Sequence, residues 1–93
     1  MARIGPVVLR IAGDRYIGGA RLGALIWDAN GATFVTGDRC VLRHHATGDI
    51  LWQGTYPDIL GANFGPSGIN VLNGFYLDRI DRGLLMVYLR EEI

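Results

Sequence analysis

The chain has 93 residues, of which 49% are hydrophobic and 19% are charged, and its nine basic and nine acidic side chains cancel at neutral pH. This length predicts a single domain over residues 1–93, and a neutral domain lacks the electrostatic attraction that supplies most non-specific affinity for nucleic acid. The single cysteine, Cys40, excludes an internal disulfide framework. No apolar run reaches the ~18 residues of a membrane span, so we expect neither nucleic acid nor a membrane as a partner.

The first segments read as strands. Residues 7–12 alternate, with Val7, Leu9 and Ile11 on one face. Residues 20–29 allow two interpretations. One face of a strand would carry Leu22, Ala24 and Ile26, whereas the i, i+3, i+4, i+7 spacing of a short helix ended by Gly31 fits Leu22, Leu25, Ile26 and Ala29. The Asn30-Gly31 pair is a strong hairpin signal and favours the strand, with a return strand over residues 32–36.

The middle of the chain predicts a hairpin. Residues 39–45 place Cys40, Leu42 and His44 on one face, residues 46–49 form a polar turn, and residues 50–55 return with Ile50 and Trp52 on one side. We expect Trp52, and Phe75 later in the chain, to lie in the core together with a buried Cys40.

The pattern breaks over residues 56–68, where glycine and proline recur between apolar side chains. Long loops in compact domains are usually functional or flexible. Two strands follow, residues 74–80 and 84–91, joined by a tight turn in which Gly83 takes a positive φ. About seven short strands at this spacing predict an all-β fold, a small antiparallel β-sandwich or barrel.

No cluster of residues predicts catalysis, a cofactor or a metal. Asp38, Cys40, His44 and His45 are possible metal ligands, but on a strand Cys40 and His44 are ~13 Å apart, too far to share a zinc ion. The only serine, Ser67, lacks the surroundings of a nucleophile. The glycine-rich residues 61–68 contain no lysine and match no phosphate-binding motif. We therefore expect a protein that is not an enzyme.

The apolar composition points instead to contact between chains. A short chain has difficulty burying so much apolar surface, although a well-filled sandwich core is the alternative. The candidate partner contacts are aromatic and apolar residues of the long loop, together with one tryptophan outside it, since aromatic side chains are enriched at interface hot spots. These candidates are Trp27, Tyr56, Ile59, Leu60 and Phe64.

Several segments together resemble small proteins encoded in the structural regions of tailed bacteriophages. They are Leu25-Ile26-Trp27, residues 36–43, residues 46–52, residues 73–77 and residues 82–89. The resemblance implies a virion accessory protein of the capsid decoration or head-fibre type, which forms homo-oligomers and binds a larger protein assembly such as a capsid. It implies no catalytic residues.

Two other functions remain open. One is a carbohydrate- or ligand-binding module that uses Trp27 or Tyr56 with residues 56–68, and the other is a small homo-oligomeric enzyme with a site between subunits. The N-terminal residues lack the pattern of a signal peptide. We therefore expect the cytoplasm of the host during synthesis, and the resemblance to phage proteins implies the virion afterwards.

Overall fold

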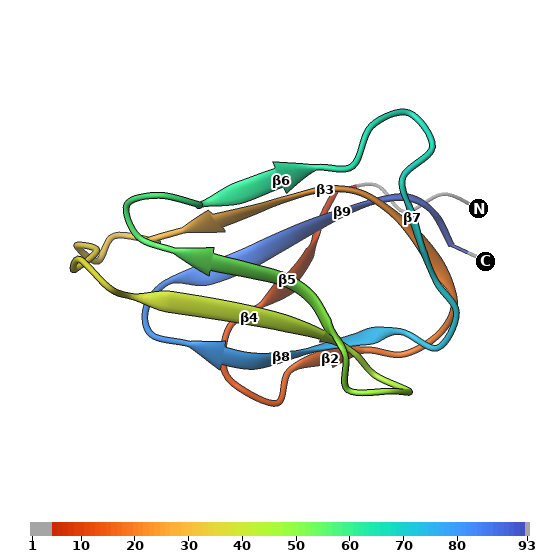
Figure 1. Ribbon diagram of the computed structural model, residues 1–93, viewed down its shortest axis with the longest axis horizontal. Coiled ribbons are helices and arrows are strands. Elements are labelled where there is room, and N and C mark those ends of the chain that lie inside the picture. Colours follow the sequence, from red (N-terminus) through yellow and green to blue (C-terminus); the bar gives the residue numbers. More distant parts are fainter. Residues whose placement is uncertain (1–4, 93) are drawn as a thin grey trace.

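The computed structural model describes residues 5–92 (Figure 1). Within this range the chain forms nine strands and no helix. None of the described residues belongs to a helix with the length and apolar character needed to cross a membrane. In chain order the strands are β1 Val7–Leu9, β2 Arg15–Tyr16, β3 Ala20–Asp28, β4 Arg39–His44, β5 Ile50–Thr55, β6 Gly61–Asn63, β7 Ile69–Val71, β8 Phe75–Ile80 and β9 Leu84–Glu92.

The strands form two antiparallel sheets, which lie as two layers in Figure 1. Sheet A has the order β1-β9-β3, and both β6 and β7 pair with the free edge of β3. Sheet B has the order β2-β8-β4-β5. Only the β4–β5 and β6–β7 connections stay within one sheet, so most connections cross between the layers. The all-β fold, expected as a small antiparallel sandwich or barrel, is confirmed, and its two separate sheets fit a sandwich. The described residues form nine strands, against about seven expected, because β2, β6 and β7 are very short.

The core fills the space between the sheets, and both sheets contribute to it. Trp52 and Phe75 are 9% and 0% exposed, which confirms their predicted core positions, and Cys40 is fully buried. In β9, Leu85 and Val87 face inward, whereas Tyr88 is exposed, as the alternation predicts. The buried cluster comprises Leu9, Ala20, Leu22, Leu25, Trp27, Cys40, Leu42, Trp52, Val71, Phe75, Leu77, Leu85 and Val87.

Strand β3 confirms the strand interpretation of residues 20–29, but its faces differ from the prediction. The register between β3 and β9 shifts on both sides of Leu22, so the strand contains a β-bulge at Gly23. Leu22 therefore faces the core, and the next inward side chain is Leu25, three positions later. Ile26, predicted to share a face with Leu22, is 47% exposed. The bulge also explains why these residues imitate helical spacing.

The turn at Asn30-Gly31 forms, but the predicted hairpin was wrong. Asn30 and Gly31 have φ values of 52° and 88°, and the Ala32 amide donates to the Ala29 carbonyl at 3.1 Å. Residues 32–36 then form no strand and lead to sheet B. Phe34 packs edge-on against Trp27, with 4.8 Å between ring centroids, and this packing holds the segment across the end of the sandwich.

Two other expectations need correction. Strand β1 ends at Leu9, and Ile11 is 66% exposed because the Asp14 carboxylate accepts the Arg10 and Ile11 amides at 2.8 and 3.1 Å and closes a turn. The loop predicted over residues 56–68 contains β6, which pairs with β3.

The predicted β4–β5 hairpin is confirmed. The turn between β8 and β9 also forms, but it joins two sheets. Gly83 there has a φ of 78°, and a Cβ atom at this position would lie 2.0 Å from the Asp28 carbonyl oxygen. Only glycine fits this turn.

Candidate interaction surface

One outer face of the sandwich is apolar. It lies on sheet A, and we call it the outer A face. The strand register places Val8, Met86 and Ile26 side by side in one row and Tyr88 beside Ala24 in the next. Val8, Ile26 and Tyr88 are 39%, 47% and 37% exposed, and Met86 and Ala24 are half-buried. No other layer of the described fold covers these side chains.

Charged side chains lie at the two ends of this apolar area. Asp28, at the end of β3, is exposed beside Leu84. At the other end the Arg90 side chain crosses β3 over Gly23, where an added Cβ atom would lie 2.9 Å from Arg90 Cγ. Its Nε donates to the Gly65 carbonyl at 3.0 Å. Beside it Arg21 pairs with Glu91 at 2.9 Å. The outer A face therefore has an acidic side chain, Asp28, at one end and a basic side chain, Arg90, at the other.

The outer face of sheet B, the outer B face, is polar by contrast. Arg43 pairs with Asp78 at 2.8 Å, and Arg79 pairs with Asp81 at 2.9 Å. These hydrogen bonds raise the pKa values of both arginines above their usual range, and the bond from Arg79 lowers the pKa of Asp81. Val41, which also points outward, is only 8% exposed among these long side chains. Ile50 of β5 is 51% exposed, but its register partner on this face is the charged Arg43. Exposed apolar side chains are therefore present on both sheets, and on the outer A face they lie next to one another.

One end of the sandwich is held by a polar and aromatic network. This loop end, formed by residues 29–38, 56–60 and 81–83, lies at the left of Figure 1. Asp38 is nearly buried, pairs with Arg82 and accepts the Val35 amide at 2.9 Å. The hydrogen bond from Arg82 is the main reason that the pKa of Asp38 is lowered. Trp27 Nε1 donates to the Arg82 carbonyl at 2.7 Å.

The predicted contact residues occupy different environments at or near this end. Trp27 is 2% exposed, so it belongs to the core and offers no surface to a partner. Tyr56 stacks on Phe34 with 4.9 Å between ring centroids. Leu60 and Phe64 are half-buried and pack against the core. Of the five candidates Ile59 is the most exposed, at 47%.

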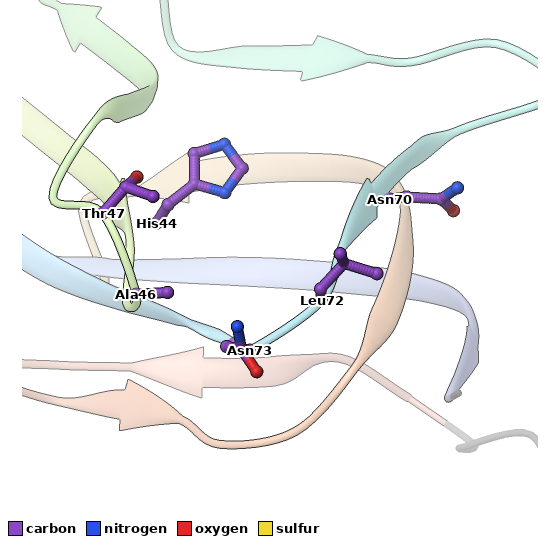
Figure 2. Close-up of a pocket in the computed structure, with 7 residues that line it drawn as sticks. His44, Ala46, Thr47, Asn70, Leu72 and Asn73 are labelled. Carbon is purple, nitrogen blue, oxygen red and sulfur yellow. The ribbon is translucent and has the colours of Figure 1, made fainter.

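A small pocket of about 230 Å³ lies at the opposite end of the sandwich (Figure 2). It is lined by His44, Ala46, Thr47, Asn70, Leu72, Asn73 and Gly74. Its polar groups do not converge, because the Asn70 amide points away from His44 and accepts a hydrogen bond from Arg21 at 3.2 Å. The pocket is smaller than typical small-molecule sites, which span about 300–1,000 Å³, and it contains neither Trp27 nor Tyr56. Of the two aromatic residues foreseen for a sugar, Trp27 is buried in the core and its ring is not open to a ligand.

The reactive side chains are either buried or dispersed. Burial, with a smaller contribution from the charge of Asp81, raises the pKa of the Cys40 thiol to about 12. This thiol is protonated and inaccessible at neutral pH. Between residues 5 and 92 no three side chains of the His, Cys, Asp and Glu types gather as a metal site would require.

The outer A face was not among the contacts predicted from the sequence, although a signal for it was present. Residues 84–89, Leu-Leu-Met-Val-Tyr-Leu, are all apolar. A strand that faces solvent on one side alternates between apolar and polar residues, and a continuous apolar run is typical of a strand covered on both faces. No protein-family model, curated protein or solved structure matches the chain.

Proposed function

We propose that this domain is a non-enzymatic assembly protein, which binds other protein chains through the outer A face. The observation that carries the proposal is the contrast between the two outer faces. Ile26, Met86 and Tyr88 lie next to one another on sheet A, whereas Ile50, the exposed apolar residue of β5, lies opposite Arg43, which pairs with Asp78 across sheet B. Adjacent apolar surface on a small domain is typical of an interaction site. The neutral net charge does little to oppose association.

The setting that we propose is the virion of a tailed bacteriophage, as a capsid decoration or accessory protein. The resemblance described above supports this setting. Contact with the larger assembly would use the loop end, where Val35 and Ile59 are 53% and 47% exposed on segments joined by the hydrogen bond from Gly37 N to Tyr56 O. This chain should then sediment with purified particles, and mass spectrometry of the pelleted particles should detect its peptides.

Site-specific photocross-linking tests the assembly role. A benzophenone amino acid replaces Ile26 on the outer A face in one variant and Gln53 on the outer B face in a control variant. We expect adducts with identified protein chains, whether further copies or a larger protein, from position 26 and none from position 53. Equal adducts at both positions, or none at position 26, would reject the proposal.

A further inference from the structure

We infer that the occupant of the outer A face is a second copy of this chain, placed by a two-fold axis that lies between the two faces and runs perpendicular to strands β3 and β9. This inference rests on the proposed function and specifies its partner. In a two-fold contact the same surface patch is used by both copies and must be complementary to itself. The outer A face meets this requirement in both shape and charge.

The axis follows from the rows of side chains along the two central strands. Successive rows on this face are Asp28 beside Leu84, Ile26 beside Met86, and Ala24 beside Tyr88, followed by Arg90 over Gly23. When the axis lies between the second and third rows, the rows of the second copy run in the opposite order. Strands β3 and β9 then each lie over the same strand of the second copy. Stacked sheets lie about 10 Å apart, a distance that side chains from both faces fill.

The apolar rows then pair large side chains with smaller or more adaptable ones. Ile26, 47% exposed, meets Ala24 of the second copy, and the symmetric contact repeats the pair. Tyr88 meets Met86 of the second copy, which brings an aromatic ring to a thioether sulfur, a favourable contact. The opposite choice, an axis parallel to the strands, would keep each row at its own height and bring no acidic end to a basic end.

The charged ends pair under the same axis. Asp28 of one copy faces the Arg90 side chain of the other, because Arg90 lies over β3 at Gly23 and not over its own strand. Two identical ion pairs therefore flank the apolar centre. The Nε bond from Arg90 to the Gly65 carbonyl holds this side chain over β3 and leaves its terminal nitrogens free to meet a carboxylate. Complementary charge of this kind fixes the orientation of a contact.

Charge reversal tests this geometry. The purified full chain, Asp28→Arg, Arg90→Asp and the double variant are compared by sedimentation equilibrium, with Gln53→Arg on the outer B face as the control and thermal melts to verify folding. We expect a dimer whose dissociation constant rises about tenfold or more in each single variant, because like charges then face each other. The double variant should return to within about threefold of the original value, since the ion pairs are rebuilt with reversed polarity.

Other results would overturn the inference. The chain could stay monomeric up to about 1 mM, where association would be very weak, or it could form an oligomer other than a dimer. The dissociation constant of the double variant could also be as high as that of the weaker-binding single variant. Asp28→Arg carries the test by itself if Arg90→Asp fails to fold, because Asp28 is exposed. Cross-links from position 26 to a different protein, with a monomeric pure chain, would reject the second copy and keep the assembly function.

Discussion

The two outer faces of the sandwich differ although both cover the same core. On the outer A face Ile26 and Tyr88 are exposed side by side with other apolar residues, whereas on the outer B face Arg43 and Asp78 form an ion pair. Exposed ion pairs contribute little to stability, and those of sheet B give its outer face a hydrated, polar surface. Large apolar side chains are also exposed in loops and at Ile50 of sheet B, where the register partner is Arg43. The comparison teaches that the arrangement of exposed apolar side chains, and not only their number, distinguishes the two faces.

The largest expected effect on stability comes from a substitution in the core, which lies beneath both outer faces. Trp27→Ala leaves a cavity beneath the loop end and deprives the Arg82 carbonyl of its hydrogen-bond donor. We expect a loss of about 3–5 kcal/mol in the free energy of unfolding, the range for a large aromatic residue in a core. Urea unfolding measures it, with Trp27→Phe as the milder control. A loss below about 1 kcal/mol would contradict the core role and return Trp27 to the surface.

An intermediate effect should separate the two faces directly. Tyr88 lies on the outer A face, and Tyr76 lies on the outer B face near His45, with 6.3 Å between ring centroids. Tyr88→Ala should weaken self-association by about 2 kcal/mol, or about 30-fold, as for an aromatic hot spot. The matched control Tyr76→Ala should leave the dissociation constant within about threefold. Sedimentation equilibrium gives both values, and equal losses would contradict the contrast between the faces.

The smallest expected effect is a loss of folding stability at acidic pH. Asp38 and Asp81 have lowered pKa values in the folded chain, chiefly because Arg82 and Arg79 donate hydrogen bonds to them. The carboxyl groups of Asp38 and Asp81 are therefore protonated at a higher pH in the unfolded chain than in the folded chain. Their contribution to stability is present above about pH 4, the pKa of an unperturbed aspartate, and is lost as the pH falls through the lower folded values.

Urea midpoints between pH 7 and pH 2 measure this loss. Asp38→Asn should be less stable than the original chain at neutral pH and should lose less stability on acidification. Asp78→Asn, which removes a carboxylate from the more exposed ion pair with Arg43 on the outer B face, is the matched control. Identical profiles for the original chain and Asp38→Asn would show that the Asp38–Arg82 pair does not contribute to acid stability.

Local patterns in the sequence predicted the fold better than they predicted its surfaces. The β4–β5 hairpin and the positive φ of Gly83 follow from residues that are neighbours along the chain. The bulge at Gly23 changes which side chains of β3 face inward, and a strict two-residue period cannot reveal it. Ile26 was therefore assigned to the same face as Leu22.

The candidate surface was missed for a different reason. Whether the outward side of β9 meets water, the other sheet or a partner depends on how the layers stack, and β9 pairs with β1 and β3 rather than with its neighbour β8. That pairing is a long-range property of the chain. The apolar run over residues 84–89 indicated that both faces of the strand are covered, but only the sheet order shows which face is still uncovered.

The way the chain passes between the layers has a consequence for how it folds. Among the nine described strands, β4 and β5 alone are consecutive in sequence and paired in a sheet. Every other pairing has to close a longer loop, which costs conformational entropy before any contact is gained. Topologies of this kind fold in about milliseconds to seconds. The β4–β5 hairpin is thus the only piece that a newly made chain can form locally, and the outer A face, built from β1, β3 and β9, is completed only when residues 84–92 arrive.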